Sequence, residues 1–164
     1  MAGILAPLLV SARINLEVQS TQCADALYEV AHLLDGHPDV TDFPGFYSEL
    51  LARERLDPTC LDNEIALPHA RTEHVTRIVM AIGRSPRGVH YENSDQTVRL
   101  ILVLGIPKSN DGGYLQVVGA LCRIIKDSAN RAALLQAPTP ADFIQTLLRL
   151  EARVLGPGPA PQVR

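Results

Sequence analysis

The run from Val98 to Ile106 most constrains how this chain can fold, because almost every side chain in it is apolar. A strand of this character has to be covered on both faces, since neither of its rows of side chains suits water. The run from Val75 to Ile82 is similar, and a shorter run from Ile65 to Leu67 ends at Pro68. The sequence therefore predicts a small sheet that is buried between other layers.

Amphipathic helices are predicted before and after these strands, where apolar residues recur at the three- and four-residue spacing of one helix face. The predicted helices cover residues 24–34, 42–56, 115–125, 130–135 and 139–154. Arg13 to Val18 alternates polar and apolar residues and predicts a half-buried strand. Gly83 to Asp95 is rich in turn residues and predicts an exposed loop. Together these elements predict an α/β fold in which a small mixed β-sheet is sandwiched between helices.

The chain has 164 residues, the length of one domain. We expect residues 1–155 to form that domain and the proline- and glycine-rich residues 156–164 to be a disordered tail. The formal net charge is −3, only 4% of the residues are aromatic, and there is no Trp. This composition gives the chain no general attraction for nucleic acid or for an anionic membrane surface.

The cysteines and the N-terminal residues indicate a cytoplasmic protein. Cys23, Cys60 and Cys122 are odd in number and widely spaced, unlike the paired cysteines of oxidised secreted domains. The apolar opening MAGILAPLLV lacks a basic start and a cleavage pattern, and it is too short to cross a bilayer. We therefore expect no membrane insertion.

The segment from Ile65 to Thr72, IALPHART, presents a histidine in a way that suits chemistry. Pro68 lacks an N–H and restricts the residue before it, so we expect the strand to be interrupted and His69 to lie on a turn at its end. Ala70 leaves room for a partner, and Arg71 adds a fixed positive charge. A single histidine beside a proline is more often a surface or capping residue, so the residues alone leave both interpretations open.

IALPHA resembles the active-site motif of phosphotransferase-system enzyme IIA domains of the fructose, mannitol and nitrogen-regulatory type (type 2). LARERL at residues 51–56, followed by Pro-Thr, is similar to a second segment of that family at the expected distance. The order of elements also fits over nearly the whole chain. The resemblance implies the fold of this family, with His69 as the phospho-acceptor, Arg53 as the arginine beside the phosphate, and Arg71 as a supporting contact.

The resemblance also implies a function. A histidine-containing phosphocarrier would donate a phosphoryl group to His69, which would pass it to an enzyme IIB domain or hold it as a regulatory signal for a target protein. Neutral imidazole is a nucleophile at about pH 7, and an arginine offers a planar donor fork to phosphoryl oxygens. This chemistry needs no metal and no other cofactor, and the other histidines show no metal-ligand spacing.

Two positions depart from the family pattern. Tyr114 replaces a second histidine that many relatives carry, and a tyrosine hydroxyl can bind phosphate but adds no positive charge. Glu64 stands where relatives often have glycine, and its carboxylate would repel a phosphoryl group if it faced the site. These departures leave open an alternative, a non-catalytic or attenuated enzyme IIA-like module that regulates a kinase or a transporter.

Two other interpretations are supported by fewer sequence features. A hydrolase that uses His69 with Asp62 or Cys60 would lack the loop motifs that such enzymes need. An exposed apolar helix face would allow a homodimer, but no residue pattern requires one. The sequence does not separate a transport role from a regulatory role, or name a sugar.

Overall fold

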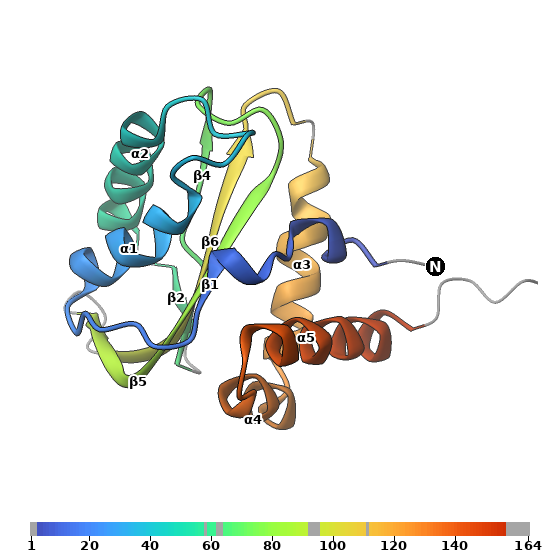
Figure 1. Cartoon of the computed structure of the whole chain (residues 1–164). Helices are drawn as coiled ribbons and strands as arrows, with labels where there is room; N and C mark the ends of the chain where they lie inside the picture. The colour runs from blue at the N-terminus through green and yellow to red at the C-terminus, as the bar shows by residue number, and fades with distance from the viewer. Residues whose placement is uncertain (1–2, 58, 62–63, 92–95, 111, 157–164) are drawn as a thin grey trace, which may run out of the picture.

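Two long antiparallel strands, β5 (Val79–Tyr91) and β6 (Gln96–Pro107), form the centre of the sheet (Figure 1). The computed structural model describes residues 3–57, 59–61, 64–91, 96–110 and 112–156. Every residue of β6 from Leu100 to Pro107 is buried, because this strand has neighbours on both sides and helices above and below. The apolar run that predicted a doubly covered strand is therefore explained by its central place.

Shorter strands complete the sheet. β1 (Ile14–Asn15) runs parallel to β5, while β3 (Ile65–Ala66) and β4 (His69–Thr72) both run parallel to β6. β2 (Cys60–Leu61) pairs antiparallel with β3. The order across the sheet is β1-β5-β6-β3-β2, and β4 follows β3 along the same side of β6. The sheet is mixed, as predicted.

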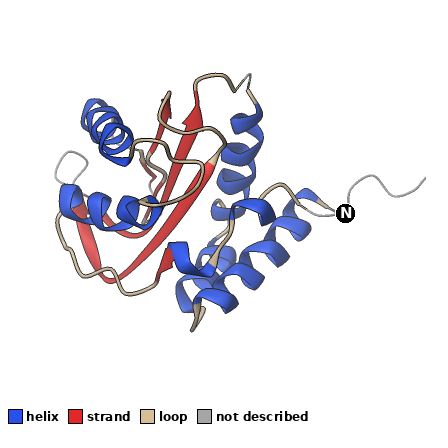
Figure 2. Ribbon diagram, turned by 45° about the horizontal axis from the view of Figure 1, so that its top comes forward, coloured by secondary structure: helices blue, strands red, loops and turns tan. Residues whose placement is uncertain are grey.

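Helices cover both faces of this sheet (Figures 1 and 2). One face carries α1 (Cys23–Ala31) and α2 (Phe43–Leu56). The other face carries α3 (Gly113–Ile125), α4 (Ser128–Gln136) and α5 (Pro140–Leu155). The predicted α/β fold, a small sheet between helices, is confirmed.

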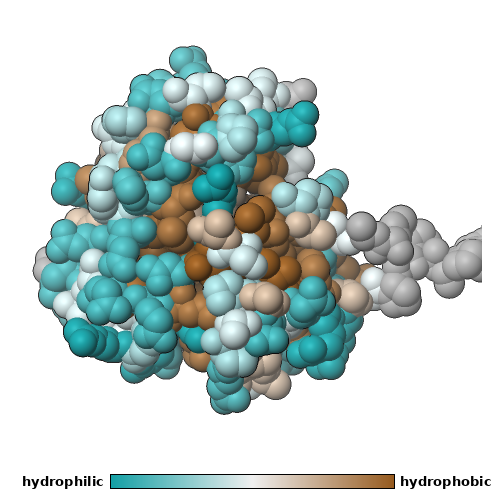
Figure 3. All heavy atoms as spheres, in the orientation of Figure 1, coloured by the Kyte–Doolittle hydropathy of each residue, from teal (hydrophilic) through white to brown (hydrophobic). Residues whose placement is uncertain are grey.

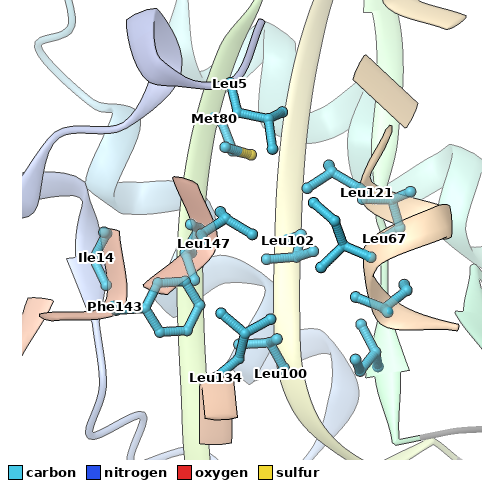
Figure 4. Packing of buried hydrophobic residues seen from close by; sticks show 14 of the residues in the cluster. Leu5, Ile14, Leu67, Met80, Leu100, Leu102, Leu121, Leu134, Phe143 and Leu147 are labelled. Atoms are coloured by element: carbon cyan, nitrogen blue, oxygen red, sulfur yellow. The ribbon is translucent and has the colours of Figure 1, made fainter. Parts of the chain in front are cut away.

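Each face of the sheet has its own hydrophobic core, because successive side chains of a strand point to opposite faces. Leu100 and Leu102 of β6 belong to the core under α3, α4 and α5 (Figure 4). The alternate residues Ile101 and Val103 belong to the core under α1 and α2. One strand therefore links the two cores.

The prediction for β5 is wrong in two details. The strand begins at Val79, because Val75 makes only an isolated bridge. It then runs through most of the segment predicted as a loop, and residues 92–95 lie outside the described residues. The turn residues fit into a strand because the pairing register shifts between Arg84 and Val89, where Gly88 adopts a φ of 88°.

The N-terminal segment crosses the face of the molecule that Figure 1 shows. It contains the 3-10 helices η1 (Ala6–Leu8) and η2 (Ser11–Arg13), and only β1 in place of the longer strand predicted for residues 13–18. A further 3-10 helix, η3 (His32–Leu34), extends α1. Apolar surface gathers in the middle of this face (Figure 3).

Among the described residues, no helix combines the length and the apolar character that a bilayer span requires. The predicted disordered tail lies outside the described residues from position 157 onward.

Candidate functional site

A pocket of about 400 Å³ lies at the edge of the sheet formed by β4. β2 pairs with β3 and not with β4, so the outer side of β4 has no strand partner within the described ranges. Three elements line the pocket: α2 provides Glu49 and Arg53, β4 provides His69, Ala70 and Arg71, and α3 provides Tyr114. The structure therefore brings together His69, Arg53, Arg71 and Tyr114, the site residues named from the sequence.

The predicted interruption of the strand at Pro68 is confirmed, but the predicted turn at His69 is wrong, because His69 is the first residue of β4. Ala66 pairs with Ile101 of β6 and His69 pairs with Leu104, so the register is the same before and after the interruption. The ladder is interrupted because Pro68 has no N–H, but the carbonyl of Pro68 still accepts from the backbone N–H of Leu104 at 2.9 Å. Strand pairing on both sides of the proline thus fixes the backbone of His69.

The imidazole of His69 is held by its own strand. Its Nδ1 lies 2.8 Å from the carbonyl oxygen of Leu67. A carbonyl oxygen can only accept a hydrogen bond, so Nδ1 is the donor and carries the proton of the neutral ring. This tautomer leaves the lone pair, and therefore the nucleophilic position, on Nε2.

Arg53 and Glu54 are neighbours on α2 with different surroundings. Arg53 lines the pocket and donates from Nη1 to the carbonyl of Asp57 at 3.1 Å, which leaves other guanidinium N–H groups available to a ligand. Glu54 is only 4% exposed and accepts from the backbone N–H of Thr59 at 2.5 Å and from its hydroxyl at 2.9 Å. Burial raises the pKa of Glu54, while its hydrogen bonds to Thr59, the charge of Arg53 and, when it is protonated, the His69 ring act in the opposite direction.

Arg71 is fixed from two sides near the start of α3. Its Nη2 donates to the carbonyl oxygens of Lys108 at 3.2 Å and Asn110 at 3.1 Å. Its guanidinium carbon lies 5.4 Å from the centre of the Tyr114 ring, within the range of a cation–π interaction. The side chain of Asn110 accepts from the backbone N–H groups of Gly112 and Tyr114, which sets the start of α3. Arg71 and Tyr114 therefore contact each other and are both positioned by Asn110.

The sequence reasoning missed Glu49 and Asn110. Glu49 lines the pocket, accepts a hydrogen bond from the hydroxyl of Thr72, and has an oxygen 3.9 Å from Nε2 of His74. The available signal was the four-residue spacing from Glu49 to Arg53, which places both side chains on one side of a helix. For Asn110 the signal was the turn sequence Asn-Asp-Gly-Gly, since an Asn side chain often accepts from the backbone that follows it.

Glu64 does not line the pocket. Its carboxylate pairs with Nε of Arg99 at 3.1 Å, and its carbonyl accepts from the backbone N–H of Arg99 at 2.8 Å. His69 lies five positions further along the chain in the same strand direction, a separation of roughly 15 Å at the usual rise of a strand. The repulsion between Glu64 and a phosphoryl group on His69 is therefore weak.

The partners considered for a hydrolase, Asp62 and the side chain of Cys60, lie outside the described residues. Within the part of the chain that the structure describes, no group of three or more His, Cys, Asp or Glu residues is arranged to hold a metal ion.

A histidine at an open sheet edge, with two arginines around the same pocket, is typical of a domain that handles an anionic group on an imidazole. Residues 8–149 match the family described as "Phosphoenolpyruvate-dependent sugar phosphotransferase system, EIIA 2". The chain belongs to this family, which confirms the resemblance drawn from IALPHA and LARERL.

Known proteins of this kind share its sequence and its fold. The chain is 28% identical over 141 residues to the PTS system fructose-specific EIIABC component of Bacillus subtilis (strain 168), a match that covers 85% of this chain and 22% of that protein. The nitrogen regulatory protein IIA-Ntr from Neisseria meningitidis has a TM-score of 0.79 at 22% identity, covering 88% of this chain and 99% of that one. The complex of enzyme IIAMTL and phosphorylated enzyme IIBMTL from Escherichia coli has a TM-score of 0.72 at 22% identity, and the match covers 85% of this chain and 96% of that one. The chain thus spans less than a quarter of the length of the curated relative, and the two structures share its fold.

Proposed function

We propose that this domain accepts a phosphoryl group on Nε2 of His69 from a histidine-containing phosphocarrier, and passes it to an enzyme IIB domain or holds it as a regulatory signal. The observation that carries the proposal is the pocket, where His69 meets Arg53 and Arg71. The bond from Nδ1 to the Leu67 carbonyl supports Nε2 as the acceptor. The similar structures include a nitrogen regulatory protein and a complex with a phosphorylated IIB, which support both uses.

The proposed transfer exchanges one N–P bond for another. The lone pair on Nε2 of His69 attacks the phosphorus of the donor phosphohistidine as the donor N–P bond breaks, and the electron pair of that bond stays on the donor nitrogen. The ring of His69 gains positive charge while the donor ring loses it, so no proton has to move. The Leu67 carbonyl favours the charged ring because it accepts from Nδ1 at 2.8 Å.

The arginines suit the charge of the group in transit. A transferring phosphoryl group spreads negative charge over its equatorial oxygens, so positioning and charge stabilisation supply most of the catalysis. Arg53 offers its free N–H groups from α2, and Arg71 offers a positive charge from β4. Arg71 lies beside Tyr114 and thus provides, at that wall of the pocket, the charge that Tyr114 lacks. The attenuated-module alternative is therefore not favoured.

Labelled phosphoenolpyruvate and the general phosphotransferase proteins provide the test. We expect acid-labile, base-stable phosphate on the wild-type protein and none on His69→Ala. His90→Ala is the matched control, because His90 is exposed on β5 and does not line the pocket. No label on the wild type under conditions that load a control IIA domain would overturn the proposal, and so would equal labelling of His69→Ala.

We also propose that residues 1–155 act as one domain in the cytoplasm, where a phosphocarrier would meet the open edge of β4. The family match over residues 8–149 supports this extent. A homodimer stays a prediction, to be checked by the mass of the protein in solution. Leu115 of α3, which is 60% exposed, belongs to the apolar surface that such a contact would use.

A further inference from the structure

Glu54 is connected to the acceptor imidazole by a chain of hydrogen bonds. Its carboxylate accepts from the backbone N–H of Thr59 at 2.5 Å and from the Thr59 hydroxyl at 2.9 Å. The carbonyl of Thr59 accepts from the backbone N–H of Leu67 at 3.2 Å. The carbonyl of Leu67 then accepts from Nδ1 of His69 at 2.8 Å. The peptide groups on both sides of Leu67 are thereby held between Glu54 and the ring.

The position of the Leu67 carbonyl decides which nitrogen of His69 is nucleophilic. If this oxygen moved out of reach, the neutral ring would lose the acceptor that keeps its proton on Nδ1. The following residue, Pro68, has no N–H with which to anchor this part of the strand. Pairing with β6 holds Ala66 and His69 on either side, and the bond from the Leu67 N–H to Thr59 adds a contact from the opposite side of the strand.

Burying the carboxylate of Glu54 costs free energy. It is 4% exposed, on a helix whose other buried residues include Phe46 and Leu50. An apolar side chain would fill the same space without the cost of desolvating a charge. Burial raises the pKa of Glu54, and the charge of Arg53, with that of the His69 ring when it is protonated, acts in the opposite direction.

We propose that Glu54 is a positioning residue that holds His69 in the Nδ1–H tautomer, acting through Thr59 and the backbone of Leu67. Its effect on phosphoryl transfer rests on the function proposed above, but its effect on the tautomer does not. Glu54 touches neither the imidazole nor the phosphoryl group in this scheme. Its contribution is to keep Nε2 available as the acceptor.

The test measures the tautomer and the rate separately. Nitrogen-15 chemical shifts of the His69 ring report the tautomer, and the initial rate of phosphorylation is measured over a range of phosphocarrier concentrations. In Glu54→Ala we expect the share of the Nε2–H tautomer to rise. We expect the maximal rate to fall by roughly 10- to 100-fold, as when an outer partner that orients a functional imidazole is removed. The phosphocarrier concentration for half-maximal rate should stay unchanged.

Conservative variants separate orientation from general damage to the fold. Glu54→Gln keeps an oxygen that can accept from Thr59, so it should recover most of the tautomer bias and of the rate. Thr59→Val keeps the backbone hydrogen bond to Glu54 but loses the hydroxyl. It should change the tautomer and the rate in the same direction as Glu54→Ala, by a smaller amount. Glu17→Gln, at an exposed glutamate outside the pocket, is the control and should change neither.

The inference fails if folded Glu54→Ala keeps the wild-type tautomer. If Glu54→Ala does not fold, a wild-type tautomer together with a wild-type rate in Thr59→Val overturns it. A wild-type protein that takes up no phosphate would overturn the proposed function instead. In that case the ring shifts would still decide the role of Glu54, so the two failures are distinguishable.

Discussion

Glu64 is the only residue other than glycine for which the described chain has a positive φ, at 70°. A side chain in this left-handed conformation brings Cβ close to the following carbonyl, which glycine avoids. A glycine at this position would therefore meet a requirement of the backbone and not of the pocket. The ion pair with Arg99 offsets little of this strain, because both side chains are largely exposed and water screens the pair.

Comparing two variants at Glu64 tests this interpretation. Glu64→Ala and Glu64→Gly both remove the ion pair, but only the glycine variant relieves the strain. We expect Glu64→Gly to exceed Glu64→Ala in free energy of unfolding by about 1 kcal/mol, measured in urea. Equal stability of the two variants would contradict the structure at this turn.

Two glutamates with opposite pKa shifts predict opposite pH dependence. Burial raises the pKa of Glu54, so its contribution to stability is present below the ordinary pKa and is lost as the pH rises through the raised value. Burial alone would raise the pKa of Glu29 of α1, but hydrogen bonds from Gln19, Ser20 and Asn15 lower it. Its contribution is present above the ordinary pKa and is lost as the pH falls.

Urea unfolding at several pH values checks both signs. The stability of the wild type relative to Glu54→Gln should fall as the pH rises above the ordinary glutamate pKa of about 4.3, while the stability relative to Glu29→Gln should fall as the pH drops below it. Slopes of the same sign for the two variants would show that one of these environments is described wrongly.

Arg53 and Arg55 provide a matched pair on one helix. Arg53 lines the pocket, whereas Arg55 is exposed and does not. Removing a donor that stabilises charge in a transition state costs about 100-fold or more in rate, so we expect Arg53→Ala to slow phosphorylation by that amount. Arg55→Ala should be phosphorylated like the wild type. Equal rates for the two variants would remove Arg53 from the proposed mechanism.

At the scale of the elements, local signals were enough for the helices. Asp42 and Thr139 were expected at the starts of α2 and α5, and the structure shows each side chain accepting from a backbone N–H of the first turn. The strands depended on more than local sequence. Pro86 and Gly88 are typical of a loop, but pairing with β6 absorbs them into β5 through a register shift. The unbroken register around Pro68 likewise depends on β6, which no pattern within IALPHA can show.

The cap of α5 gives a prediction at this scale. Thr139→Ala removes the hydroxyl that accepts from the backbone N–H of Asp142 at 3.1 Å, and should lower the free energy of unfolding by about 1 kcal/mol. Thr139→Ser keeps a capping hydroxyl and should lie close to the wild type. Phosphorylation should be unchanged in both, because α5 does not line the pocket.

At the scale of the whole molecule, the sheet joins two cores, and the pocket lies at the edge where α2 and α3 approach β4 from opposite faces. The sequence predicted the layers because each apolar face needs a cover. It named His69, Arg53, Arg71 and Tyr114 largely through the family resemblance. Glu49 was missed because its place in the pocket depends on how α2 packs beside β4, and Asn110 because its carbonyl meets Arg71 from a distant part of the sequence.

The shared strand β6 predicts cooperative unfolding. Leu100→Ala leaves a cavity in the core under α3, α4 and α5, and Ile101→Ala leaves a cavity in the core under α1 and α2. Each should destabilise the protein by about 2–5 kcal/mol. Far-ultraviolet circular dichroism and tyrosine fluorescence should still report a single transition. Two separated transitions in either variant would show that the two layers fold independently.

Nuclear magnetic resonance of the phosphorylated protein, labelled with nitrogen-15 in its histidines, is the most direct test of the central claim. The account predicts a phosphorus–nitrogen coupling at Nε2 of His69, with Nδ1 still protonated and bonded to the carbonyl of Leu67. Coupling at Nδ1, or phosphate on a different residue, would contradict it.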